Sequence, residues 1–237
     1  GAQQASGALD SAQDLLITTL PQYQHDIRWL PLVRREQELN LSAHAACSFA
    51  MLKTAERPTL RYSVAVAAAP GYAVVMTAHS KLYQRWLQQK PDNIARWLVM
   101  QKDVTGLMES GRAKPEFVRR ISGGRFIVFP LQTNPVALLA HGRADYWIEY
   151  PARANYLLAE YPDRQLQLHS VFLQPDQVSL SYVACSPATP DHVMQDINTA
   201  LKQLLPQQPY QQALYKWNDT ESMQQLLKLY QQHVLQE

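Results

Sequence analysis

A strand–helix–strand pattern over residues 125–150 is the sequence feature that most constrains the fold. Arg125–Phe129 and Asp145–Tyr150 are short apolar runs typical of buried strands. Between them, Asn134 and Pro135 supply an N-cap and a first-turn proline, and Gly142 can end the helix. A helical connection of this kind joins parallel strands of one sheet. We therefore expect an α/β fold with mainly parallel sheets flanked by helices.

Strands and helices also alternate through the rest of the 237 residues. We expect further strands at Ala45–Phe49, Tyr23–Leu30, Tyr72–Thr77, Trp97–Gln101 and Ser179–Cys185, and a strand-to-helix loop over Lys102–Thr105. Amphipathic stripes predict two C-terminal helices, one after Thr189-Pro190 and one from Thr220. This length suits two lobes, and parallel sheets bind ligands at the carboxyl ends of their strands.

The composition argues against nucleic acid and membrane partners. A net charge of +2, from 22 basic and 20 acidic residues, gives no strong overall field. We interpret the local basic cluster Arg112, Lys114, Arg119, Arg120 and Arg125 as a solvated face. No apolar run approaches the roughly 20 residues that cross a bilayer, so we expect no direct membrane insertion, and any export leader has been removed.

The known catalytic and metal-binding patterns are absent from the sequence. The 7 histidines are scattered without an HExxH pair, and there is no GxSxG, SxxK or glycine-rich phosphate loop among only 8 glycines. We interpret Glu36 and Glu38 as solvated helix acids, not an acid and base pair. We therefore expect no metal, no cofactor and no enzymatic activity.

Cys47 and Cys185 lie far apart, without the CxxC spacing of a zinc or redox motif. From the residues alone they are either one disulfide or two buried thiols. A nucleophilic Cys47 beside His44 is the less favoured interpretation, because a cysteine in a run of small residues more often acts as a buried apolar residue.

The turn Lys53–Pro58, KTAERP, places a hydroxyl, an acid and a guanidinium directly after an expected strand. Taken alone, Arg57 would form a surface salt bridge with Glu56 or another acid. However, three stretches together resemble the bacterial extracytoplasmic solute-binding protein family that includes amino-acid-binding components of ABC importers. These are KTAERPTLRYS at 53–63, LLAHGRADYWIEYP at 138–151 and SLSYVACS at 179–186.

The resemblance implies a two-lobed, type 2 periplasmic-binding-protein-like fold with two crossover hinge strands, of the kind called a Venus flytrap. Lobe one would comprise 1–77 and 183–237, and lobe two 78–182. The implied function is a periplasmic, monomeric binding protein that encloses a small polar carboxylate-bearing ligand, such as an amino acid, between its lobes for an ABC permease. The alternatives are a ligand-sensing domain or degenerate binder that reports to a membrane signalling protein, and then an enzyme. The implied oxidising compartment permits disulfides, and we therefore expect Cys47 and Cys185 to be bonded.

The resemblance also implies roles for single residues. Arg57 would bind the ligand carboxylate, with Thr54 in the same turn, because a guanidinium matches a carboxylate bidentately. The acid that would pair with a ligand amine stands one residue early, at Glu149, and Leu52 replaces a hydroxyl. Aromatic residues either line a cleft or pack in the core: Trp29, Tyr72, Tyr146, Trp147 and Tyr150. On a strand, Trp147 and Glu149 share one face. The candidate ligand-binding residues are Arg57, Thr54, Tyr72, Thr105, Glu149 and Tyr150.

Overall fold

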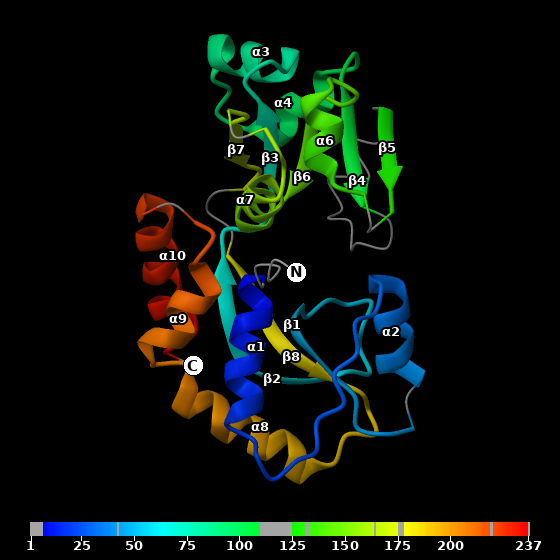
Figure 1. Ribbon diagram of the computed structural model, residues 1–237, viewed down its shortest axis with the longest axis vertical. Helices are drawn as coiled ribbons and strands as arrows, with labels where there is room; N and C mark the ends of the chain where they lie inside the picture. The colour runs from blue at the N-terminus through cyan, green and yellow to red at the C-terminus, as the bar shows by residue number, and fades with distance from the viewer. Residues whose placement is uncertain are drawn as a thin grey trace. The chain divides into compact units, whose positions relative to one another are not determined.

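The computed structural model describes residues 7–41, 43–109, 125–130, 133–163, 165–174, 178–218 and 220–236. The basic stretch 112–120 and the side chain of Arg125 lie outside the described part. The chain forms two compact units (Figure 1). The first unit contains 1–69 and 178–237, and the second contains 70–177. Both ends of the chain therefore belong to the first unit.

The strand pairings move both expected lobe boundaries toward the N-terminus. The strand at Ala73–Thr77 pairs with strands of the second unit on both sides, so it does not belong to lobe one. Residues Ser179–Tyr182 pair instead with strands of the first unit. Because hydrogen-bonded strands form one sheet, the boundaries lie near 69 and 178 and not at 77 and 183.

The first unit is built around a three-stranded sheet in the order β1-β8-β2. Both pairings are antiparallel, so the expectation of parallel strands is wrong for this sheet. Its strands are β1 (Cys47–Leu52), β2 (Arg61–Ala69) and β8 (Ser179–Cys185). Its helices are α1 (Ala8–Thr18), α2 (Leu32–Leu41), α8 (Asp191–Leu204), α9 (Gln208–Tyr215) and α10 (Thr220–His233).

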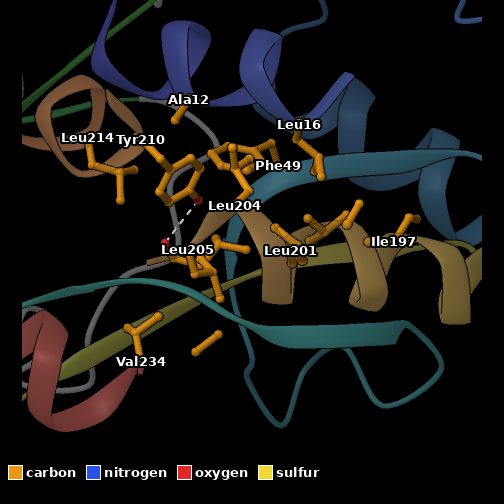
Figure 2. Packing of buried hydrophobic residues seen from close by; sticks show 14 of the residues in the cluster. Ala12, Leu16, Phe49, Ile197, Leu201, Leu204, Leu205, Tyr210, Leu214 and Val234 are labelled. Carbon is orange, nitrogen blue, oxygen red and sulfur yellow. Dashed lines mark hydrogen bonds between the residues drawn. The ribbon is translucent and has the colours of Figure 1, made fainter. Parts of the chain in front are cut away.

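The main core of the first unit lies between this sheet and helices α1, α8, α9 and α10. Helix α8 contributes Ile197, Leu201 and Leu204, whose spacing of three and four residues places them on one face. Figure 2 shows these side chains packed with Phe49 and Tyr210. On the other face of the sheet, Leu39 of α2 packs against β1 and β8. Both faces of the sheet are therefore covered by helices.

Cys47 and Cys185 form a disulfide between directly opposed residues of β1 and β8. The expectation of a disulfide is thus confirmed. Beyond Cys47 the register of β1 shifts between Ser48 and Met51, and Ala50 has φ +56°. This bulge lets β1 send Phe49 into the main core and Met51 toward α2.

The second unit is a five-stranded sheet in the order β5-β4-β6-β3-β7. Strand β4 pairs in parallel with β5 and β6, whereas β3 pairs antiparallel with β6 and β7. The strands are β3 (Ala73–Thr77), β4 (Thr105–Glu109), β5 (Arg125–Phe129), β6 (Tyr146–Glu149) and β7 (Leu168–Phe172). The helices are α3 (Lys81–Gln89), α4 (Ile94–Met100), α6 (Pro135–Ala140) and α7 (Pro151–Ala159).

Helices α3 and α4 cover one face of this sheet, and α6 and α7 cover the other. The expected strand–helix–strand segment is present as β5-α6-β6, with Asn134 accepting a hydrogen bond from the Val136 amide. Strand β4, however, lies between β5 and β6. The two-lobed α/β fold class is confirmed, with mixed and antiparallel sheets.

Two expected strands are wrong. Residues Trp97–Gln101 lie mostly in helix α4, because Asn93 caps its first turn through the Arg96 amide. The expected strand Tyr23–Leu30 is absent, because residues 23–30 contain no strand. Within the described ranges, no helix has the length and apolar character needed to cross a bilayer.

Candidate ligand-binding site

The turn that carries Arg57 follows β1 directly. The Arg57 amide donates to the Thr54 carbonyl at 3.1 Å, which closes the turn. Thr54 and Arg57 are both partly buried, and the Arg57 side chain is only 12% exposed. The sequence therefore places a guanidinium, mostly withdrawn from water, at the end of a strand.

The Arg57 guanidinium binds two oxygens of the first unit. Its Nη1 donates to the Leu52 carbonyl at 3.0 Å, and its Nη2 donates to a carboxylate oxygen of Glu36. Glu36 extends from α2, which Leu39 anchors to the sheet. The interpretation of Glu36 as a merely solvated acid is therefore wrong, and the salt-bridge alternative for Arg57 is realised with Glu36.

The same turn contains an unused polar atom. The Thr54 hydroxyl oxygen is buried and has no hydrogen-bond partner in the described part of the chain. Nearby, the Tyr62 hydroxyl donates to the Arg57 carbonyl at 3.4 Å. Burial raises the pKa of Tyr62, while the Arg57 charge acts in the opposite direction. Thr54 and Arg57 are thus brought together as expected, in a turn with spare hydrogen-bonding capacity.

In the second unit, two acids end parallel strands side by side. Glu109 is the last residue of β4 and Glu149 the last of β6, and their side chains are 1% and 0% exposed. Arg153 in the first turn of α7 binds both through Nη1, with 2.7 Å to the Glu109 Oε2. A buried carboxylate requires such a partner, because desolvation of an unpaired charge is strongly unfavourable. We call these residues the Glu109–Arg153–Glu149 cluster.

Sequence reasoning missed Glu109 and Arg153. Had Thr105–Glu109 been recognised as a strand, its terminal acid would have stood out, since parallel strands end at a common edge. Arg153 lies 5.4 Å from the Trp147 ring centre, so Trp147 and Glu149 do share one face as predicted. The arrangement can hold charge at the carboxyl edge of the sheet.

Tyr72 and Tyr150 meet beside this cluster. Their ring centres are 4.5 Å apart, and the rings are inclined by 37°. Tyr72 directly precedes Ala73, which is opposite Glu149 in the β3–β6 register, and the Tyr150 amide donates to Glu149 at 2.8 Å. The structure therefore groups Tyr72, Glu149 and Tyr150 within the second unit.

Thr105 is not part of this group. It begins β4, at the end opposite Glu109, and its amide donates to the Asp145 carboxylate at 2.8 Å. The expected strand-to-helix loop over Lys102–Thr105 is wrong, because residues 101–104 connect helix α4 to strand β4. Of the other aromatic residues, Tyr146 and Trp147 are buried in the core, and Trp29 is 77% exposed in a segment without regular structure.

Comparisons with known proteins rest on structure alone. No family model and no curated protein matches the sequence. A mutant of ArgBP from T. maritima matches with 19% identity and a TM-score of 0.66, over 87% of this chain and 84% of that chain. A Salmonella typhimurium periplasmic binding protein with high arginine specificity matches with 15% identity and a TM-score of 0.65, over 89% and 88%.

The chain has the type 2 periplasmic-binding-protein fold. An ancestral amino acid-binding protein, AncCDT-1, shares it with 16% identity and a TM-score of 0.62, over 90% of this chain and 84% of that one. That protein is a precursor of cyclohexadienyl dehydratase. The structures that resemble the chain are thus mostly binding proteins, and one of them is the precursor of an enzyme.

Proposed function

We propose that the chain is a solute-binding protein for a small polar ligand with a carboxylate group, and that Arg57 binds this carboxylate. Presentation of the ligand to an ABC permease outside the cytoplasm is part of the proposal. It is supported by the binding proteins that share the fold and by the Cys47–Cys185 disulfide, which suits an oxidising compartment. That the two units enclose the ligand stays a prediction.

The observation that carries the proposal is the bond between Arg57 and the carboxylate of Glu36. Because the guanidinium already binds one carboxylate, we propose that a ligand carboxylate takes the same position once Glu36 turns away. A hydrogen bond to a charged group contributes about 1.5–3 kcal/mol, whereas micromolar affinity requires about 8 kcal/mol. Further contacts must therefore add to Arg57. Thr54, Tyr72 and Tyr150 remain predicted contacts, whereas the predicted contact at Glu149 would require its bond with Arg153 to open.

A second candidate is a sensing or degenerate binding domain. Its support is that the charged candidates Arg57 and Glu149 each have a built-in counter-ion, Glu36 and Arg153. A ligand must compete with these, which weakens binding. A domain of this kind would report to a membrane signalling protein and would not deliver its ligand. An enzyme is the third choice, and turnover of any bound ligand would favour it.

A thermal-shift screen of amino acids, dicarboxylates and polyamines tests the proposal, because binding to the folded state raises the melting temperature. We expect Arg57→Ala to abolish the shift produced by each carboxylate ligand. Arg61→Ala is the matched control, since Arg61 belongs to the same unit but pairs with Asp191 and not with Glu36. Each variant is compared with its own ligand-free melting temperature. Equal ligand shifts in both variants would show that Arg57 is only structural.

A further inference from the structure

The ion pair between Arg57 and Glu36 places two opposite charges side by side within the first unit. The Arg57 side chain is 12% exposed and the Glu36 side chain 34% exposed, so the acid is the more accessible partner. Arg57 uses Nη1 and Nη2, while its Nε forms no hydrogen bond within the described residues. An ammonium group next to a carboxylate, as in an α-amino acid, has the complementary pattern of charges.

Glu149 is poorly placed to accept a ligand ammonium. Both of its carboxylate oxygens are engaged, one by the Tyr150 amide and the other by Arg153, and its side chain is 0% exposed. An ammonium would have to displace a guanidinium from a buried acid. Breaking such a pair is strongly unfavourable. Another acid is therefore needed if the ligand carries an amine.

We propose that Glu36 is this acid: it releases Arg57 to the ligand carboxylate and accepts the ligand ammonium group. The inference rests on the proposed function, since it uses Arg57 as the carboxylate-binding residue. One internal ion pair is exchanged for two ion pairs with a zwitterion, so every charge keeps a partner. The Glu36 side chain has three rotatable bonds and is about one-third exposed, which allows its carboxylate to move off the guanidinium without leaving the site.

The exchange makes the site selective for zwitterions. A carboxylate without an amine would bring a second negative charge next to Glu36, and two neighbouring carboxylates repel each other. An amine without a carboxylate would bind Glu36 only by taking it from Arg57, which would leave a mostly buried guanidinium unpaired. Only a ligand that carries both groups satisfies both side chains.

The experiment compares amino acids with their des-amino analogues by calorimetry: L-alanine with propionate, L-glutamine with glutaramate, and L-aspartate with succinate. In the wild-type chain we expect at least one amino acid to bind about tenfold or more tightly than its analogue. In Glu36→Gln this preference should fall to about onefold, because the amide offers no charge. Glu38→Gln is the control, since Glu38 lies on the same helix and pairs with Arg34. It should keep the preference.

A modified ligand also tests the inference on the wild-type chain. N-acetylation removes the charge of the amine, so N-acetyl-glutamine should bind the wild-type chain no better than glutaramate. Arg57-dependent binding with no amine preference would overturn the inference and leave the proposed function standing. The inference would also fail if Glu36→Gln raised the affinity for an amino acid and for its des-amino analogue by the same factor. Glu36 would then only compete with the ligand carboxylate for Arg57. If no carboxylate compound binds, either among these probes or in the thermal-shift screen, the proposed function fails as well.

Discussion

At the scale of single residues, Arg153 links two buried acids of the second unit. It alone contacts both Glu109 and Glu149 among the described ion pairs, and the two acids are almost fully buried. The same guanidinium lies over the Trp147 ring. Because two carboxylates end neighbouring strands, their mutual repulsion would act directly on the sheet without a cation between them.

We predict that Arg153→Gln lowers the stability of the second unit by about 3 kcal/mol, since it removes a cation that pairs with two buried acids. Arg153→Lys should retain much of the stability, because it keeps the positive charge although it loses the planar fork. Chemical denaturation followed by tryptophan fluorescence measures both variants. Arg85→Gln is the control, since Arg85 pairs with an exposed Asp103 and exposed pairs contribute little. Equal losses of stability in Arg85→Gln and Arg153→Gln would contradict this account of the cluster.

At the scale of elements, two tyrosines attach α9 to the edge of the antiparallel sheet. The hydroxyls of Tyr210 and Tyr215 donate to the carbonyls of Val66 and Ala68 on β2, both at 3.0 Å. Strand β2 is an edge strand in this sheet. Side-chain donors thus satisfy carbonyls along an edge and help to keep it from pairing with another chain. Burial raises the pKa of both tyrosines, which keeps the hydroxyls protonated as donors.

We expect Tyr210→Phe to destabilise the first unit by about 1–2 kcal/mol, because the Val66 carbonyl loses its donor in a buried position. Tyr83→Phe provides the comparison, since no hydrogen bond of the Tyr83 hydroxyl is present in the described structure and its ring stacks on His169. Its stability should change by less than about 0.5 kcal/mol. Urea unfolding midpoints measure both variants. A smaller loss of stability in Tyr210→Phe than in Tyr83→Phe would contradict the prediction.

The elements also show what sequence can and cannot predict. Periodicity and cap residues predicted α6, α8 and β8, because those signals are local. The predicted strand at Trp97–Gln101 was wrong, since a short apolar segment fits either a strand or a buried helix, and the cap at Asn93 favours the helix. Arg57 was located from its motif. Its contact with Glu36 could not be predicted, because that pairing depends on how α2 packs against β1.

At the scale of the whole molecule, the Cys47–Cys185 bond closes a chain segment that contains the entire second unit. The two cysteines are 138 residues apart in sequence, and both lie in strands of the first unit. Loop closure over more than 100 residues stabilises by about 4–5 kcal/mol in the chain-entropy description, and by less when part of the loop stays folded. The bond should therefore act mainly on the first unit, which holds both ends of the loop.

We predict that reduction lowers the melting temperature of the first unit by roughly 10 °C and leaves the second unit nearly unchanged. Hydrogen exchange separates the two responses, because amides of β2 report on the first unit and amides of β3 on the second. The double variant Cys47→Ala with Cys185→Ala should reproduce the effect and no longer respond to reductant. Two reactive thiols in the unreduced, unfolded chain would contradict the bond itself. Equal acceleration of exchange in β2 and β3 would instead show that the two units unfold as one, since the constraint would then act on the whole chain.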